Sequence, residues 1–198
     1  MGDPKRQRRK FDTPRFPWRK DILDEELKLL GTYGLRNKHE LWRHETQLSK
    51  FRGIARSLIG RPTAERMKME NELLTRLKKL AVLQETAVLD DVLDLSLEDL
   101  LERRLQTLVF KKTLAKTVHQ SRQLVTHGHI TLNGRRVTVP GYIVSREEEK
   151  TLTYAPESQL VNAAHPTRVA MTVVAKPRQV AQPRFRRGGG GRRGGGRF

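Results

Sequence analysis

Residues 103–136 contain eight Lys or Arg side chains and no Asp or Glu, although the 198-residue chain has 22 acidic residues. This acid-free stretch also holds three of the six histidines, and it includes an Asn-Gly pair typical of a hairpin turn. Cations and hydrogen-bond donors without intervening acids suit the phosphate backbone of a nucleic acid. They do not suit a small neutral substrate.

The formal net charge of +18 is concentrated at the two ends of the chain. Residues 1–20 carry eight basic and two acidic groups, and residues 184–198 carry six Arg and no acid. Residues 96–155 have ten basic and six acidic groups, whereas residues 21–95 have thirteen of each. Basic tails around a neutral body indicate a nucleic-acid partner. The alternative is a charge that serves only solubility.

Several classes of protein are excluded or disfavoured. The chain has no cysteine, which excludes disulfides, thiol catalysis and cysteine-ligated zinc. No apolar run approaches the ~18 residues of a membrane span, and the N-terminus lacks the apolar segment of a signal peptide. The acidic clusters are expected to be solvated loops rather than metal or acid–base sites: Asp90, Asp91 and Asp94, and Glu147, Glu148 and Glu149. We therefore expect no metal, cofactor, catalytic residue, membrane or small-molecule substrate.

Apolar spacing predicts three helices in residues 21–95. Gly31 and Gly60 mark the ends of the first two. Asn37 and Glu40 form a capping box at the start of the second. The expected bounds are residues 21–31, 37–60 and 63–81, followed by an irregular segment over residues 82–95.

The acid-free stretch begins inside a predicted fourth helix. Ser96 and Asp99 form its capping box, and a leucine stripe predicts helix as far as Leu108. On such a helix Arg103 points away from the stripe and is the preferred contact residue. Arg104 falls within the arc of the stripe, so that an exposed contact and a buried structural role both stay open for it.

A fifth helix is predicted between Thr117 and Gly128, with a polar, donor-rich outer face. The hydrophobic period then changes to two, and Asn133-Gly134 predicts a hairpin. Further short strands are expected in YIV, residues 142–144, and in TLTY, residues 151–154. The sequence thus predicts an α+β fold: a helical region, two helices packed on a small antiparallel sheet, and extended basic tails.

These patterns divide the chain into five segments: a basic extended arm (1–20), a helical region (21–95), the helix–sheet module (96–160), an irregular extension (161–183) and an Arg/Gly-rich tail (184–198). The aromatic side chains Phe11, Phe16 and Trp18 either anchor the arm to a protein surface or stack on bases. Packing is the preferred interpretation for both Trp18 and Trp42.

The motifs LLERRL, HGHI, NGRRV and PGYIV resemble the RNA-binding fold named after ribosomal protein S-four. Longer collinear stretches over residues 13–55 and 96–155 resemble the small-subunit ribosomal protein S-four family, in its archaeal and eukaryotic branch. They include TPRFPW, LDEELKLLGTYGLRNKHELWR and LAKTVHQSRQLVTHGHI. The segment GHITLNGRRVTVPGYIV is closer to the archaeal type. Many bacterial relatives carry zinc-binding cysteines, which this chain lacks.

The resemblance implies a structural constituent of the small ribosomal subunit in the cytoplasm. Such a protein is a primary binder of small-subunit ribosomal RNA (rRNA) that nucleates assembly of the subunit body, contributes to translational accuracy and lies near ribosomal protein S-five. The main alternative is an assembly factor of the same fold that binds small nucleolar or pre-ribosomal RNA. An RNA-modifying enzyme would need a catalytic domain that residues 1–95 do not offer. A DNA-compacting protein is a further alternative.

The candidate RNA-binding residues are the basic, polar and histidine side chains of the module. Arginine and lysine would meet phosphates, while the amides and histidines would bond to sugars or splayed bases. The predicted set is Arg103, Arg104, Lys111, Lys112, Lys116, Thr117, His119, Gln120, Arg122, Gln123, His127, His129, Asn133, Arg135 and Arg136.

Overall fold

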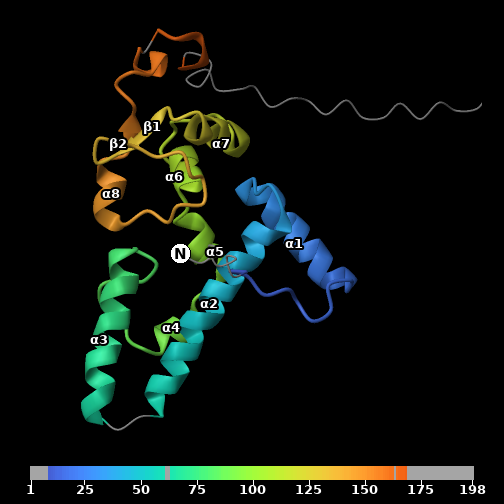
Figure 1. Ribbon diagram of the computed structural model, residues 1–198, viewed down its shortest axis with the longest axis vertical. Helices are drawn as coiled ribbons and strands as arrows, with labels where there is room; N and C mark the ends of the chain where they lie inside the picture. Colours follow the sequence, from blue (N-terminus) through green and yellow to red (C-terminus); the bar gives the residue numbers. More distant parts are fainter. Residues whose placement is uncertain (1–8, 61–62, 163, 169–198) are drawn as a thin grey trace, which may run out of the picture.

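Long helices occupy one end of the molecule and a small helix–sheet module occupies the other (Figure 1). This computed structural model describes residues 9–60, 63–162 and 164–168. The helical end consists of α1 (Lys20–Tyr33), α2 (Lys38–Ile59), α3 (Thr63–Lys79) and α4 (Asp91–Asp94). The chain continues through α5 (Leu97–Glu102), α6 (Leu105–Lys111), α7 (Val118–Thr126), β1 (Ile130–Leu132), β2 (Arg135–Arg136), α8 (Arg146–Lys150), β3 (Thr153–Tyr154) and the 3-10 turn η1 (Gln159–Val161).

The sheet of the module has the order β2-β1-β3, and both strand pairs are antiparallel. Asn133 and Gly134 form the predicted hairpin turn, with φ angles of 49° and 75°. The expected α+β fold is confirmed. The YIV segment does not join this sheet as a strand, because Ile143 instead forms an isolated bridge with Arg104.

Three hydrophobic clusters hold the elements together. The largest lies in the module, where Leu105, Val125 and Ile130 are fully buried. A second cluster joins α2, α3 and α4 with Leu100 of α5. A third packs α1 and α2 against Leu101. The short helix α5 therefore contributes to the core of the helical end, whereas α6 belongs to the core of the module.

The first helix is longer than predicted. It continues through Gly31 and ends at Tyr33, because Gly34 adopts the left-handed conformation with φ 58° that terminates a helix. A Cβ at position 34 would lie 2.8 Å from the side chain of Val118. This glycine therefore also permits α1 to dock against the start of α7.

The predicted fourth helix is broken after Glu102. Arg104 has an extended backbone, with φ −68° and ψ 141°. Its neighbours pair with the segment that follows the hairpin, since Val144 N–H donates to the Arg103 carbonyl at 3.0 Å and Leu105 N–H donates to the Tyr142 carbonyl at 2.8 Å. Strand-like pairing with residues 142–144 thus overrides the continuous leucine stripe.

Glu147, Glu148 and Glu149 do not form the expected loop. They lie in α8, which starts with a capping box between Ser145 and Glu148. At the start of α2, Asn37 accepts from Glu40 N–H at 3.1 Å as expected. The reciprocal half of the expected capping box does not form, because the Glu40 side chain accepts from arginines instead. Local polar signals therefore set helix starts correctly even where the surrounding pattern is misleading.

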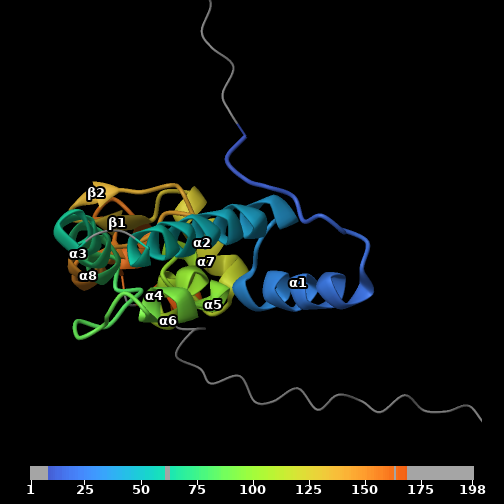
Figure 2. The same cartoon turned by 90° about the horizontal axis from the view of Figure 1, so that it is seen from below.

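Four of the five predicted segments lie partly or wholly outside the described residues. These are residues 1–8 of the arm, 61–62 of the helical region, 163 and 169–183 of the C-terminal extension, and the whole tail, 184–198. Seen from below, the described part of the arm passes the N-terminal end of α2 and loops out to the start of α1 (Figure 2). Among the described helices, none has the length and apolarity to cross a membrane.

Candidate nucleic-acid interface

The outward face of α7 presents polar side chains to solvent. His119, Gln123 and His127 are all exposed, whereas Leu124 and Val125 point into the module core. Thr117 caps the helix by accepting from Gln120 N–H at 3.1 Å. As predicted, the apolar face of the helix packs on the core and its hydrogen-bond donors lie on the surface.

Beside this face, α7 and the hairpin border a groove of about 530 Å³. It collects five residues of the predicted set: Gln120, Gln123, His127, His129 and Arg136. The rings of His127 and His129 are nearly parallel, at 10°, with their centroids 6.2 Å apart. The residues that follow β3 form the opposite wall, including Ser158, whose hydroxyl lies 2.9 Å from His129 Nδ1.

The hairpin supplies two arginines with different environments. Arg135 is exposed and forms no ion pair with another described residue. Arg136 pairs with the exposed Glu157, and its stem lies over Gly128, where a Cβ would come within 2.7 Å of it. Gly128 has φ 76°, so both its backbone and the contact with Arg136 require glycine.

Three other cations of the predicted set are held by acidic or carbonyl groups within the module. Arg103 pairs with Glu149 at 2.8 Å, and its side chain is only 13% exposed. Lys112 donates to the carbonyl of the same glutamate. Lys111 pairs with Glu102 at 3.0 Å, but its side chain remains 47% exposed.

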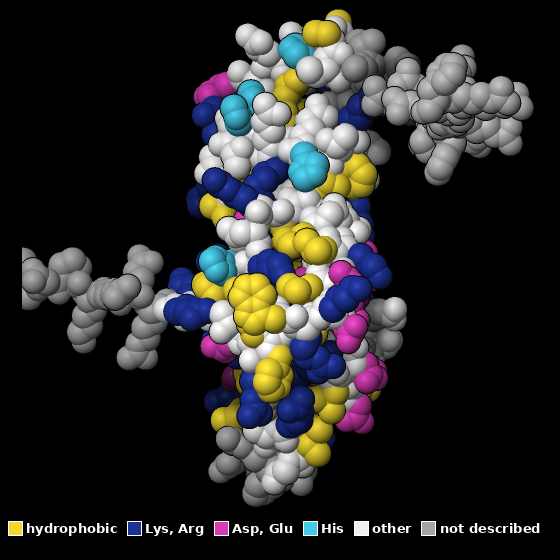
Figure 3. Space-filling view, turned by 90° about the vertical axis from the view of Figure 1, so that its right-hand side faces the viewer, with side chains coloured by type: hydrophobic (Ala, Val, Ile, Leu, Met, Phe, Trp, Pro, Cys, Tyr) yellow, Lys and Arg dark blue, Asp and Glu magenta, His cyan; other side chains and the backbone are white. Residues whose placement is uncertain are grey.

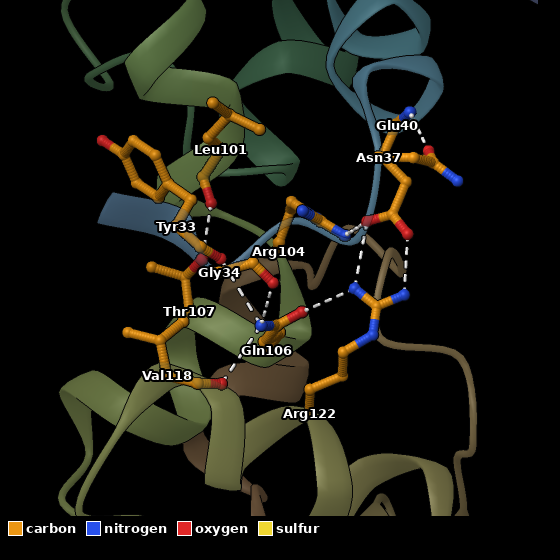
Figure 4. A network of polar contacts seen from close by, with 10 residues as sticks. All are labelled: Tyr33, Gly34, Asn37, Glu40, Leu101, Arg104, Gln106, Thr107, Val118 and Arg122. Carbon is orange, nitrogen blue, oxygen red and sulfur yellow. Dashed lines mark hydrogen bonds and ion pairs between the residues drawn. The ribbon is translucent and has the colours of Figure 1, made fainter. Parts of the chain in front are cut away.

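Arg104 and Arg122 bind one carboxylate of the helical end (Figure 4). Arg122 Nη2 lies 2.7 Å from Glu40 Oε1, and Arg104 Nη2 lies 2.8 Å from Glu40 Oε2. Arg104 is 1% exposed, and its Nε and Nη1 have no hydrogen-bond partner among the described residues. We call Glu40, Arg104 and Arg122 the clamp, since they join α2 to the module.

Gln106 extends the clamp toward α1. Its amide is fully buried and donates to the carbonyls of Gly34 at 2.9 Å and Val118 at 3.1 Å. Its amide oxygen accepts from Arg122 at 3.3 Å. The ends of α1 and α7 are therefore bonded to one side chain of α6 (Figure 4).

Two groups at the clamp, Glu40 and His44, have shifted pKa values. Burial would raise the pKa of Glu40, but hydrogen bonds and charge from Arg122 and Arg104 outweigh it and lower that pKa. Burial, reinforced by the charge of Arg104, lowers the pKa of His44 to about 4. At neutral pH the site therefore contains an ionised Glu40 and an uncharged His44.

Comparison with known proteins matches the S4 domain to residues 103–150. Three archaeal proteins named small ribosomal subunit protein uS4 match most of the chain. The protein of Ignicoccus hospitalis is 56% identical over 158 residues, covering 80% of this chain and 95% of its own length. The proteins of Thermoplasma volcanium and Hyperthermus butylicus are 51% and 54% identical over 174 and 158 residues, covering 86% and 80% of this chain and 87% and 90% of their own lengths.

The chain belongs to the uS4 family. This membership confirms the resemblance deduced from residues 13–55 and 96–155. It also confirms the prediction of a ribosomal protein rather than an enzyme.

Within this uS4 chain, the predicted site residues separate by exposure. One group is exposed: Lys111, Lys116, Thr117, His119, Gln123, His127, Asn133, Arg135 and Arg136. Another is partly buried: Arg103, Lys112, Gln120, Arg122 and His129. Arg104 is buried, which decides its open assignment in favour of a structural role. The expectation for Arg103 needs correction, since it lies against Glu149 rather than free on an outer face.

Sequence reasoning missed the second role of Glu40. It was expected only as the capping partner of Asn37, yet its side chain binds two arginines that lie 64 and 82 positions later. Gln106 was not singled out, although a polar residue inside a leucine stripe is a signal of a buried hydrogen-bonding role.

Proposed function

We propose that this chain is a structural constituent of the small ribosomal subunit that binds small-subunit rRNA through the outer face of residues 96–160. We further propose that it nucleates assembly of the subunit body in the cytoplasm, contributes to translational accuracy and lies beside ribosomal protein S-five. Family membership supports the ribosomal role. The S4 domain match supports the location of the RNA-binding unit.

The observation that carries the proposal is the sorting of charge within the acid-free stretch. Two of its less exposed arginines, Arg104 and Arg122, pair with Glu40. Its exposed cations and donors lie on α7, the preceding connection and the hairpin. Of these, Lys116 and Arg135 form no ion pair within the described part of the chain. Phosphates can therefore approach Lys116 and Arg135 without displacing an internal partner.

RNA recognition at such a face differs from simple charge attraction. Lys116 and Arg135 would meet phosphates and release counterions. The groove beside His127 and His129 offers hydrogen-bonding groups and flat rings for sugars or exposed bases. The combination suits an RNA junction, whose bases and backbone are presented together, better than a uniform duplex.

Sedimentation of the tagged full-length protein tests this function. A constituent is expected on mature small subunits and polysomes in near-equal stoichiometry, and it should stay bound after a high-salt wash. An assembly factor would appear only on precursor particles. Absence of the protein from mature subunits would overturn the proposal.

A further inference from the structure

The end of the N-terminal arm carries the most exposed large aromatic side chain of the described residues. Trp18 is 88% exposed and Phe16 is 58% exposed. The other tryptophan, Trp42, donates its Nε1–H to Glu26 at 2.8 Å and contacts Phe11 with ring centroids 6.0 Å apart. The packing expected for both tryptophans is thus found only for Trp42.

Contacts on both sides hold the segment that presents Trp18. On one side, Phe11 stacks on His39 with centroids 4.7 Å apart, and Asp12 N–H donates to Thr46 Oγ1 at 2.9 Å. On the other side, Arg19 is the residue that precedes α1, and its carbonyl accepts from Leu23 N–H at 3.0 Å. The loop between these anchors is therefore displayed in a preset position, which lowers the entropy lost on binding.

Residues 15–19 form their own concave surface at this loop. Arg15, Phe16, Pro17, Trp18 and Arg19 line a depression of about 380 Å³, to which no other described residue contributes. The guanidinium of Arg15 lies over the ring of Phe16, 5.5 Å from its centroid. On this side of the molecule, apolar side chains lie among Lys and Arg side chains (Figure 3).

The charge of the segment selects among possible partners. Residues 9–20 contain five basic groups and one acid, and Arg15 and Arg19 flank the aromatic residues of the loop. Arg19 lies 4.0 Å from Asp21, but both side chains are mostly exposed, so this ion pair is weak and a phosphate can replace it. An apolar protein interface would desolvate these arginines. A nucleic acid instead offers a base that can stack on the Trp18 ring and phosphates that can bind the guanidinium groups. Basic side chains beside exposed aromatic rings are the typical surface for single-stranded nucleic acid.

We infer that the loop of residues 15–19 is a second RNA-binding site, at which Trp18 stacks on an unpaired base while Arg15 and Arg19 bind the flanking phosphates. The inference rests on the proposed function, because it names a further contact with the same class of ligand. It places RNA against α1 and the arm as well as against the module. The chain would then hold its RNA at two separate points.

The two tryptophans allow a direct optical test in the full-length protein. Trp42→Phe leaves Trp18 as the only tryptophan, and Trp18→Phe leaves Trp42. On titration with transcribed small-subunit rRNA, the emission of Trp18 should be quenched, whereas that of Trp42 should change little. Filter binding of the same samples establishes that each variant is bound. Unquenched Trp18 in protein that is bound to rRNA would overturn the inference and leave the proposed function intact.

Affinity measurements separate stacking from general apolar contact. Loss of one base–aromatic stack costs roughly tenfold to a hundredfold in affinity, so Trp18→Ala and Trp18→Leu should both weaken rRNA binding by about this factor. Trp18→Phe should retain most of it. Full affinity for purified rRNA in Trp18→Leu, combined with poor incorporation when the other subunit proteins are present, would show a protein-docking role and refute stacking. Failure of the wild-type chain to bind rRNA would instead refute the proposed function.

Discussion

Two groups of basic side chains in the acid-free stretch have opposite environments. In the clamp, Arg104 and Arg122 converge on Glu40 and join the module to α2. On the outer face, Lys116 and Arg135 are exposed and keep their charge available. The difference shows that a basic cluster in a sequence identifies candidates for RNA binding, and that acidic residues elsewhere in the chain decide which of these cations remain unpaired.

Removal of the shared carboxylate should give the largest effect. Glu40→Gln leaves two guanidiniums facing each other without a counter-charge, and loss of one partner from a buried pair costs about 3–5 kcal/mol. Urea unfolding should therefore show this loss in the free energy of unfolding. Glu157→Gln is the matched control, because its pair with Arg136 is exposed and should contribute at most about 1 kcal/mol. Equal losses in the two variants would refute the clamp.

Low pH should weaken the contact between α2 and the module, because His44 becomes protonated. Its pKa is lowered to about 4 from an ordinary value of 6.5, so between these values the unfolded chain binds a proton that the folded chain does not. Stability is therefore complete above pH 6.5 and should fall by about 3 kcal/mol as the pH drops to 4. Glu40 adds to the fall, because its lowered pKa means that its contribution to stability is lost as the pH falls below 4.5 and through the folded-state value.

Unfolding measured at intervals across this pH range checks the assignment. His44→Leu should show a flatter dependence between pH 6.5 and 4 than the wild-type chain. An unchanged slope would mean that another group takes up the proton.

Arg103 gives a smaller effect of the same kind. Its guanidinium binds Glu149 and the Val144 carbonyl, and hydrogen bonds of this charged type contribute about 1.5–3 kcal/mol. Arg103→Ala should thus lower stability by about 2 kcal/mol while leaving the rRNA affinity of the folded protein nearly unchanged. Lys150→Ala, at an exposed site nearby, should change neither the stability nor the rRNA affinity. A large loss of rRNA affinity in Arg103→Ala would restore this residue to the interface.

Local signals in the sequence predicted much of the module. The cap at Thr117, the left-handed Gly128 and the turn at Asn133-Gly134 each depend on residues within a few positions, and all three occur in the structure. The partner of Arg104 lies 64 positions away and that of Arg103 lies 46 positions away. No periodicity can reveal such pairs, so the sequence located the basic stretch without showing which of its cations are internal.

The break between α5 and α6 has the same origin. The leucine stripe through Leu97, Leu101 and Leu105 is real, since these residues contribute to the hydrophobic clusters. It passes from one cluster to another, however, and the intervening backbone pairs with residues 142–144. A leucine stripe whose residues pack into two different cores has the spacing of one continuous helix, and only the tertiary contacts reveal the break.

The salt dependence of rRNA binding tests the central distinction most directly. In the double variant Lys116→Ala/Arg135→Ala, two phosphate contacts are removed, so the log–log slope should flatten by roughly 1.4–1.8 with unfolding stability preserved. The charge-matched control Lys68→Ala/Arg76→Ala on α3 should bind with the wild-type slope. An unchanged slope in the first variant, or an equal change in both, would contradict the assignment of the free outer cations to the RNA face.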